Sequence, residues 1–292
     1  MWYTSDFKDY ELLDASDGER LERWKDIILI RPDPQIIWKN SKKHPLWNKA
    51  DAHYIRSSKG GGSWDVRSIK NDLLNKGWKI ERKGLSFCVR PTGFKHTGVF
   101  PEQAVNWDFI SEKIKNAGRE ISVLNLFAYT GGATLACAKA GAKVCHVDAS
   151  KGIVAWAKEN ASLSALENAP IRYIVEDCKK FLEREIRRGH TYDAIIMDPP
   201  SYGRGPGGEV WKLEDGIDEL VRLTSELISD NPLFVLINSY TTGLSASTVG
   251  YLLELYIKSK HAGVVTCDEI GLPVTATSQI LPSGSSARWE IK

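Results

Sequence analysis

The chain has 292 residues, 42% of them hydrophobic, and a formal net charge of +2. This length allows one large domain or two modest ones, and no stretch approaches the roughly 20 consecutive apolar residues of a membrane-spanning helix. The first residues are charged and aromatic, unlike a signal peptide, and the five cysteines lack ligand spacing. We therefore expect a cytoplasmic chain with reduced thiols, no metal site and no membrane contact.

Basic residues are concentrated in the first third of the chain. Residues 1–100 carry 19 Lys and Arg against 13 Asp and Glu, whereas the remainder carries 20 against 24. Within residues 39–95 the numbers are 14 and 4, and aromatic residues are interleaved. Basic side chains neutralise phosphates and aromatic rings stack on bases, so this segment favours RNA contact, although a solvated face over buried tryptophans is an equally simple interpretation. The candidate RNA-contacting residues are Lys42, Lys43, Arg56, Lys59 and, farther along the chain, Arg204.

The first 95 residues contain short β-like runs at 26–31, 35–39, 79–82 and 86–90. Turns rich in Gly, Pro and Asp separate these runs, and the stretch SSKGGGSW is typical of a surface loop. Residues 1–95 are therefore predicted to form a small β-rich domain that recognises the substrate.

From residue 96 onward, apolar runs alternate with helical stretches. Strands are expected at 121–127, 143–148, 172–175, 193–197, 233–238, 264–269 and 288–292, and helices at 132–140, 151–163, 179–188, 215–229 and 246–260. The stretch LPSGSSARWE before the end of the chain is interpreted as a turn or a substrate-side loop. Because strands that alternate with helices at this spacing form parallel sheets, residues 96–292 are predicted to form an α/β domain with a Rossmann-like, doubly wound, mostly parallel seven-stranded sheet.

Ligands of such sheets bind beyond the carboxyl ends of the strands. The first strand is followed by FAYTGGAT, in which Gly131 and Gly132 permit close approach of the backbone to a ligand. The motif lacks the third glycine of a pyrophosphate-binding turn, so it suits a ligand without phosphates, or a tight turn that binds nothing. The second strand ends in Asp148, whose carboxylate can accept hydrogen bonds from both hydroxyls of a ribose or simply begin the next helix.

Two further acids follow strands. Asp177 can accept a hydrogen bond from an adenine amine, cap the next helix, or do both. Asp198 stands where the apolar residues of the fourth strand stop, and the two prolines behind it stiffen the backbone. Tyr202 offers a stacking face, and the alternative for this segment is a stiff loop without a ligand. Acids behind three strands, together with the glycine turn, indicate a ligand that contains adenosine.

Five motifs carry a resemblance to a known family: FKHTGVFPEQAVNW (94–107), NLFAYTGG (125–132), VDAS (147–150), EDCKKFL (176–182) and MDPPSY (197–202). Over residues 90–292 the chain resembles the class I S-adenosylmethionine-dependent methyltransferases, and within them the bacterial 23S rRNA large-subunit methyltransferases that act on cytosine C5 and guanine N7. A PUA domain, which some members carry, is not evident.

The resemblance implies S-adenosyl-L-methionine as the cofactor. In the family, the segment before the first strand closes over the cofactor, the glycine turn wraps its methionine end, and the acids behind the second and third strands hold its ribose and adenine. The cofactor-binding residues implied in this way are Thr97, Phe100, Gln103, Phe127, Ala128, Tyr129, Thr130, Gly131, Gly132, Asp148, Ala149, Asp177 and Cys178. The residues implied to face the methyl group and its acceptor are Asp198, Pro199 and Tyr202.

The positions of the cysteines limit which atom can accept the methyl group. Methylation at C5 of a pyrimidine requires a thiolate that first attacks C6, and family members that do this carry a cysteine after the fourth or fifth strand. Here Ser201 and Tyr202 follow the prolines, and Ser239 and Tyr240 follow the fifth strand. We therefore expect direct transfer to a base nitrogen, with Asp198 and the Pro199 carbonyl accepting hydrogen bonds from an amine and Tyr202 stacking on a flipped base. Amino-methyltransferases usually place the aromatic residue directly after the prolines, and here Ser201 intervenes.

Four functions remain open on these grounds. The first is an RNA methyltransferase, with rRNA as the expected partner, and the second is a methyltransferase that acts on a protein or a small molecule. A nicotinamide dehydrogenase is disfavoured by the missing GxGxxG motif, and a non-catalytic binding module is disfavoured by the cluster around Asp198. The oligomeric state is left open, with a homodimer as one candidate.

Overall fold

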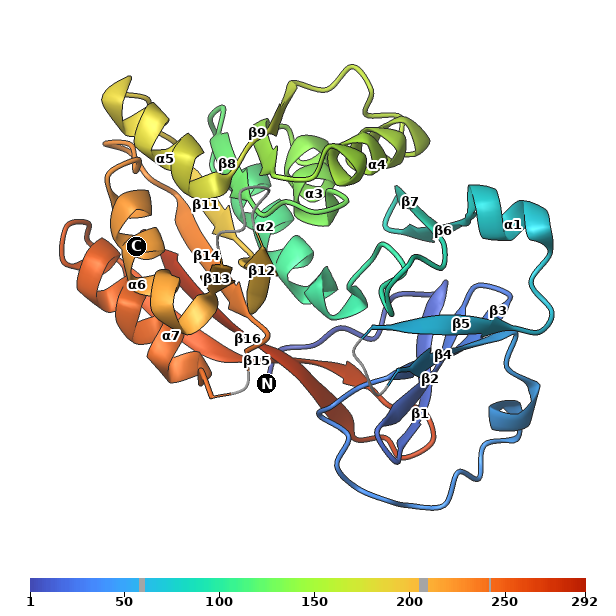
Figure 1. Ribbon diagram of the computed structural model, residues 1–292. Coiled ribbons are helices and arrows are strands. Elements are labelled where there is room, and N and C mark those ends of the chain that lie inside the picture. Colours follow the sequence, from blue (N-terminus) through green and yellow to red (C-terminus); the bar gives the residue numbers. More distant parts are fainter. Residues whose placement is uncertain (58–60, 205–209, 242) are drawn as a thin grey trace. The chain divides into compact units, whose positions relative to one another are not determined.

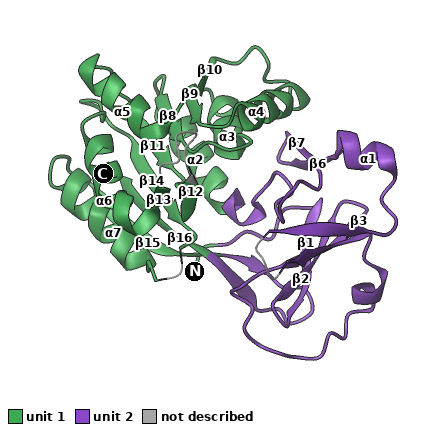
Figure 2. Cartoon of the chain, in the orientation of Figure 1, with its two compact units in different colours: residues 1–2, 105–270, 284–292 green, residues 3–104, 271–283 purple. Residues whose placement is uncertain are grey.

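The computed structural model describes residues 1–57, 61–204, 210–241 and 243–292. The chain divides into two compact units, which Figure 2 shows in different colours. Unit 1 comprises residues 1–2, 105–270 and 284–292, and unit 2 comprises residues 3–104 and 271–283. Residues 96–104 and 271–283 thus pack with the N-terminal unit. In the described part of the chain, no helix combines the length and the apolar character needed to cross a bilayer.

Unit 1 is built around a seven-stranded sheet (Figure 1). In spatial order its strands are β10 (Ile171–Val175), β9 (Lys143–Asp148), β8 (Ser122–Leu126), β11 (Ala194–Met197), β14 (Phe234–Ser239), β16 (Ile280–Glu290) and β15 (Val264–Pro273). The pairs from β10 to β14 are parallel, whereas β14 and β16 are antiparallel. The predicted Rossmann-like, mostly parallel seven-stranded sheet is therefore confirmed.

Helices pack on both faces of this sheet. They are α2 (Ala104–Asn116), α3 (Gly132–Lys139), α4 (Lys151–Leu163), α5 (Cys178–Arg187), α6 (Leu213–Ser225) and α7 (Ala246–Leu253), which continues as the π-helical segment Glu254–Lys258. In β11, Ala194 and Ile196 belong to a core cluster with α2 and α3, whereas Ile195 and Met197 belong to one with α5, α6 and α7. Because successive side chains of a strand point to opposite faces, each buried apolar strand contributes to both clusters.

Unit 2 contains a five-stranded sheet, so the predicted β-rich N-terminal region is confirmed. Its strands, in order, are β1 (Tyr10–Ser16), β2 (Glu19–Trp24), β3 (Ile27–Pro32), β4 (Ala52–Arg56) and β5 (Gly62–Val66). The other elements are the hairpin of β6 (Trp78–Arg82) and β7 (Leu85–Val89), the short helix α1 (Asn71–Lys76), and the 3-10 turns η1 (Pro45–Lys49) and η2 (Pro101–Gln103).

Three local expectations are wrong. Residues 35–39 form no strand; the carbonyls of Ile36 and Trp38 instead accept hydrogen bonds from the β1–β2 turn. Residues 281–290 are not a loop but part of β16, where Ser286 pairs opposite Asn238 of β14. In the predicted loop SSKGGGSW, the last three residues belong to β5, and residues 58–60 lie outside the described part of the chain.

Candidate functional site

The loop between β8 and α3 has an unusual backbone at the carboxyl edge of the sheet. Phe127 and Tyr129 have φ angles of 53° and 49°, which non-glycine residues rarely adopt, and Gly131 follows with a φ of 90° as the N-cap of α3. Such strain persists only where surrounding contacts impose it, and it is common at ligand-binding sites. The loop is held to β9, because the amide of Ala128 donates a 3.0 Å hydrogen bond to the carbonyl of Val147.

Gly132 is required by packing. A Cβ atom at this position would lie 2.5 Å from the ring of Trp107 on α2, which is closer than any real contact. The ring of Trp107 is buried, so it has little room to move. The second glycine of the motif thus lets α3 begin directly against α2.

Substituting Gly132→Ala should destabilise unit 1 by about 1–3 kcal/mol, the usual cost of overpacking a core. The measurement is the free energy of unfolding from urea titration. Gly152→Ala is the matched control, because nothing lies within 4 Å of a Cβ at that position on α4, and alanine there should be neutral or stabilising. Equal stability of the two variants would contradict this assignment.

Asp148 connects the ends of β8 and β9. Its Oδ2 accepts a 3.0 Å hydrogen bond from the amide of Tyr129, and its Oδ1 accepts one of 2.9 Å from the amide of Ser150. Burial raises the pKa of this carboxyl, while the two amides oppose that rise. Each carboxylate oxygen has a second lone pair, so Asp148 can hold the loop and accept hydrogen bonds from two ligand hydroxyls at once.

The raised pKa of Asp148 gives a pH-dependent prediction. Only the ionised form accepts hydrogen bonds at both oxygens, so affinity for a ribose-containing ligand should be full at neutral pH. It should fall as the pH drops through this raised pKa, at a higher pH than for an ordinary aspartate. Calorimetric titration at a series of pH values measures this, and Asp148→Asn should remove the dependence. Persistence of the same pH dependence in that variant would refute the assignment.

Cys178 and Asp177 lie at the beginning of α5. The amide of Phe127 donates to the sulfur of Cys178 at 3.3 Å, and burial raises the pKa of that thiol well above its ordinary value. Cys178 is therefore a neutral group that supports the loop and is not a thiolate nucleophile. The Asp177 carboxylate accepts a 3.0 Å hydrogen bond from the amide of Lys180, so it caps α5, and its predicted contact with an adenine stays a prediction.

The segment after β11 is fixed by a tryptophan. Asp198 is half-buried and Pro199 is buried, and the indole N–H of Trp211 donates a 2.7 Å hydrogen bond to the carbonyl of Pro200. The Trp211 ring also lies 6.0 Å, centre to centre, from the ring of Phe127 in the β8–α3 loop. Trp211 therefore joins the loops that follow two adjacent parallel strands, β8 and β11.

Tyr202 is half exposed on a short hairpin, β12 (Tyr202–Arg204) with β13 (Val210–Lys212). The amide of Leu213 donates to the carbonyl of Ser201 at 3.1 Å, which closes the base of this hairpin. The Arg204 side chain lies outside the described residues, as does all of Lys59. The proposed roles of these two residues stay predictions.

The remaining predicted residues of unit 1 also lie at this edge. Ala128 and Thr130 are buried in the β8–α3 loop, and Ala149 is exposed behind β9. Thr97, Phe100 and Gln103, in contrast, belong to unit 2, where Thr97 and Gln103 are buried and Phe100 is half-buried. Their predicted closure over the cofactor stays a prediction.

The candidate RNA-contacting residues of unit 2 differ in their surroundings. Lys42 forms a 2.5 Å ion pair with Glu19 and lies 4.4 Å above the ring of Trp47. Lys43 and Arg56 are exposed. Lys42 is therefore largely engaged within the unit, whereas the other two side chains extend into solvent.

Sequence reasoning did not identify three residues that shape the site. Trp107 packs on Gly132, Trp211 links the two loops, and the buried Asn160 of α4 donates a 2.9 Å hydrogen bond to the carbonyl of Thr130. Of these three, only Asn160 could have been noticed in the sequence, because it is a polar residue at a helix position that is expected to face the core.

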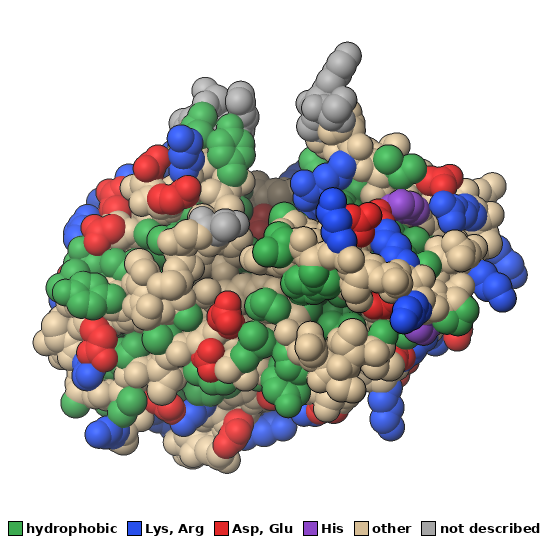
Figure 3. All heavy atoms as spheres, turned by 90° about the horizontal axis from the view of Figure 1, so that it is seen from below, with side chains coloured by type: hydrophobic (Ala, Val, Ile, Leu, Met, Phe, Trp, Pro, Cys, Tyr) green, Lys and Arg blue, Asp and Glu red, His purple; other side chains and the backbone are tan. Residues whose placement is uncertain are grey.

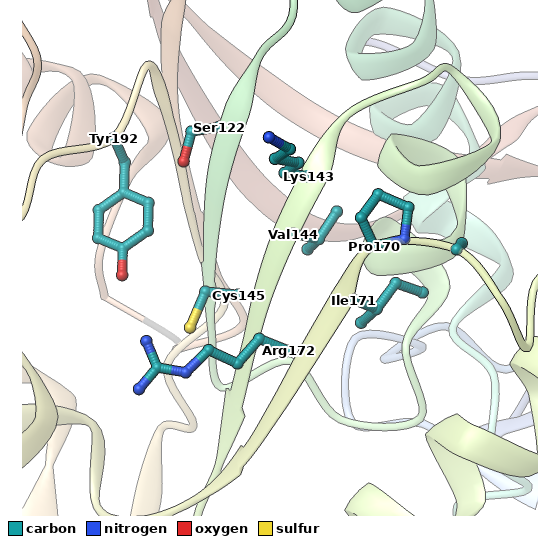
Figure 4. Close-up of a pocket in the computed structure, with 9 residues that line it drawn as sticks. Ser122, Lys143, Val144, Cys145, Pro170, Ile171, Arg172 and Tyr192 are labelled. Carbon is teal, nitrogen blue, oxygen red and sulfur yellow. The ribbon is translucent and has the colours of Figure 1, made fainter.

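A pocket of about 420 Å³ lies elsewhere on unit 1, and Figure 4 shows the residues that line it. Ser122, Lys143 and Ile171, which line it, are the first residues of β8, β9 and β10. The pocket therefore lies at the amino edge of the sheet, opposite the acids described above, and it is not part of the candidate site.

The chemistry of the carboxyl edge suits a cationic ligand without phosphates. Residues 127–134 contain no Lys or Arg, and the acid Asp148 ends β9 while Asp198 follows β11. A dinucleotide would require cations or a further glycine to hold its pyrophosphate, whereas a sulfonium is compatible with nearby carboxylates.

Comparisons with known proteins agree with this chemistry. Residues 64–254 match the model of the S-adenosylmethionine-dependent methyltransferase family. A crystal structure of an S-adenosylmethionine-dependent methyltransferase from Agrobacterium tumefaciens is similar with a TM-score of 0.91 and 37% identity, covering 100% of this chain and 93% of that one.

Two curated relatives match a shorter region. The ribosomal RNA large subunit methyltransferase K/L of Shewanella frigidimarina is 32% identical over 161 residues, which is 54% of this chain and 22% of that protein. The protein of the same name from Pseudoalteromonas atlantica is 35% identical over 145 residues, 49% of this chain and 19% of that protein. The match thus spans only about a fifth of the length of these curated relatives.

Proposed function

Because the chain belongs to the family of S-adenosylmethionine-dependent methyltransferases, we propose that it methylates a base nitrogen in RNA, with ribosomal RNA as the substrate class. S-adenosylmethionine supplies an electrophilic methyl group on a sulfonium, and the leaving thioether is neutral. The protein therefore contributes alignment and exclusion of water more than acid catalysis.

The residues of the carboxyl edge fit this cofactor. The β8–α3 loop would hold its methionine portion, Asp148 would accept hydrogen bonds from the ribose hydroxyls, and Asp177 with Cys178 would border the adenine. The pre-formed hydrogen bonds of Asp148 to Tyr129 and Ser150 support this proposal, because they fix the carboxylate before any ligand arrives.

The placement of the thiols is the observation that carries the nitrogen acceptor. Residues 198–204, which follow β11, and residues 239–245, at and after the end of β14, contain no cysteine. Cys178, at the edge of the site, is buried and accepts a hydrogen bond from a loop amide, and the exposed Cys267 lies on the edge strand β15. A covalent attack on a pyrimidine therefore has no suitable nucleophile, whereas a nitrogen lone pair needs none.

Asp198 is the residue proposed to orient the acceptor. Its carboxylate would accept a hydrogen bond from an amine N–H and direct the nitrogen lone pair toward the methyl group. Pro199 would position the backbone behind it, and Tyr202 on the β12–β13 hairpin would stack on the base. Transfer of the methyl group to an amine first gives a positively charged ammonium. This group then releases its extra proton to solvent.

Two features support RNA as the substrate. The curated relatives are named as ribosomal RNA methyltransferases, and the basic excess of residues 39–95 lies in unit 2. A ribosomal RNA substrate would place the protein in the cytoplasm.

Methyl-labelled cofactor tests the substrate class directly. Label should enter total RNA from cells that lack this protein, and ribonuclease but not protease should release it. Heat-denatured enzyme is the control. Label that protease releases, or label in small molecules alone, would instead support the protein or small-molecule alternative.

A further inference from the structure

The β4–β5 hairpin of unit 2 carries an aromatic pair on one face. Tyr54 pairs directly with Trp64, and Arg56 pairs with Gly62. Because directly opposed residues of antiparallel strands share a face, Tyr54, Trp64 and Arg56 lie on the same side of the sheet. Tyr54 is buried, and its ring meets that of Trp64 edge-on at 5.4 Å, so the indole has a fixed position.

Trp64 in turn fixes the turn that precedes His96. Its indole N–H donates to the carbonyls of Thr92 and Phe94, at 3.0 and 3.2 Å. Within the turn, the amide of Phe94 donates to the Thr92 hydroxyl, which itself donates to the carbonyl of His96. Phe94 is nevertheless 68% exposed. An exposed ring on a backbone that is held in place suits a stacking partner from outside the chain.

Basic side chains surround this turn. Arg56 is exposed, and it has no carboxylate partner among residues 1–57, 61–204, 210–241 and 243–292. The Lys95 ammonium lies 3.4 Å from the carbonyl of Pro32. Burial lowers the pKa of Lys95 to about 8, and Arg20, Arg31 and Arg56 act in the same direction, against Asp33. Arg20 and Arg31 are already paired with Glu22 and Asp33, so a phosphate at this turn would meet Arg56 and Lys95 rather than these two arginines.

Figure 3 shows Lys and Arg side chains on part of one face, with acidic, histidine and hydrophobic side chains among and beside them. Cations beside an exposed ring are complementary to a phosphate backbone with unstacked bases. A duplex keeps its bases stacked on one another, so the exposed ring favours a single strand.

We propose that Phe94, supported by Trp64, together with Arg56 and Lys95, binds a single-stranded segment of the RNA substrate. One base stacks on Phe94, and a phosphate lies near Arg56 and Lys95. This inference rests on the proposed RNA substrate and adds a surface of unit 2 that would hold it.

Fluorescence anisotropy with a short labelled oligouridylate tests this proposed RNA-binding surface of Phe94, Arg56 and Lys95. Phe94→Ala should weaken binding about 5- to 150-fold, the range for one stacked base, and Phe94→Tyr should restore it. Arg56→Ala should reduce the slope of log K against log salt concentration by about 0.7, the value for one phosphate of a single strand.

Matched controls lie on unit 1. Tyr251→Ala removes an aromatic ring that is 69% exposed, and Arg172→Ala removes an exposed arginine; both variants should bind the oligonucleotide like the wild type. If the wild type methylates RNA but Phe94→Ala and Arg56→Ala bind the oligonucleotide normally, the proposed RNA-binding surface is wrong and the proposed RNA substrate is kept. If the wild type neither binds nor methylates RNA, both proposals fail.

Discussion

Replacing Asp198 by alanine should lower the rate of methyl transfer by about 10²- to 10⁴-fold, while the affinity for S-adenosylmethionine stays close to that of the wild type. The expectation follows from its position. Asp198 directly follows the central strand β11 and precedes the hairpin that carries Tyr202, and it makes none of the hydrogen bonds that fix Asp148. The measurement is single-turnover transfer of labelled methyl, with calorimetric cofactor binding in parallel.

Two further variants sharpen this result. Asp198→Asn keeps one hydrogen-bond acceptor and should retain more activity than the alanine variant. Asp215→Ala removes an exposed acid of α6 and should leave transfer unchanged. If Asp198→Ala turned over at the wild-type rate, the acceptor site would have to lie elsewhere.

Replacing Asp148 by alanine should instead weaken the binding of S-adenosylmethionine, because this residue is proposed to contact the cofactor and not the acceptor. Loss of the ribose hydrogen bonds should cost about 1–3 kcal/mol, which corresponds to about 5- to 150-fold weaker binding. The amides of Tyr129 and Ser150 would also lose the carboxylate that they share, so the strained β8–α3 loop should become less rigid.

Calorimetry measures the affinity of this variant, and amide hydrogen exchange measures the protection of the loop. Asp230→Ala is the control, since this exposed acid precedes β14 at the opposite edge of the sheet. Unchanged cofactor affinity in Asp148→Ala would show that Asp148 does not bind the cofactor.

The α/β part of the fold could be predicted because its signals are local. Apolar runs such as 143–148 are buried on both faces, and Ser150 and Ser245 cap the helices that follow. The strands of unit 2 gave weaker signals. Four of the six residues of ERLERW in β2 are charged, and two of them, Arg20 and Glu22, are buried. Glu22 can be buried because Arg31 on β3 binds both of its carboxylate oxygens, at 2.5 and 2.7 Å. That pairing depends on tertiary structure and is not visible in a window of sequence.

In the candidate site, too, features with local sequence signals could be predicted and long-range contacts could not. The glycine turn and the acids lie at the carboxyl ends of the strands, as expected, because these ends meet at one edge of a parallel sheet; their roles in binding stay predictions. Trp107 and Trp211 were not predicted, since each acts through a contact with a residue far away in sequence. The dehydrogenase and the non-catalytic module are excluded by membership in the methyltransferase family.

The most direct test of the account identifies the product. Purified protein is incubated with methyl-labelled S-adenosylmethionine and ribosomal RNA from cells that lack it, and the digested nucleosides are analysed by mass spectrometry. The account predicts one nucleoside with the methyl group on a base nitrogen. Formation of 5-methylcytosine would contradict it, because that product requires a cysteine nucleophile that the site does not provide.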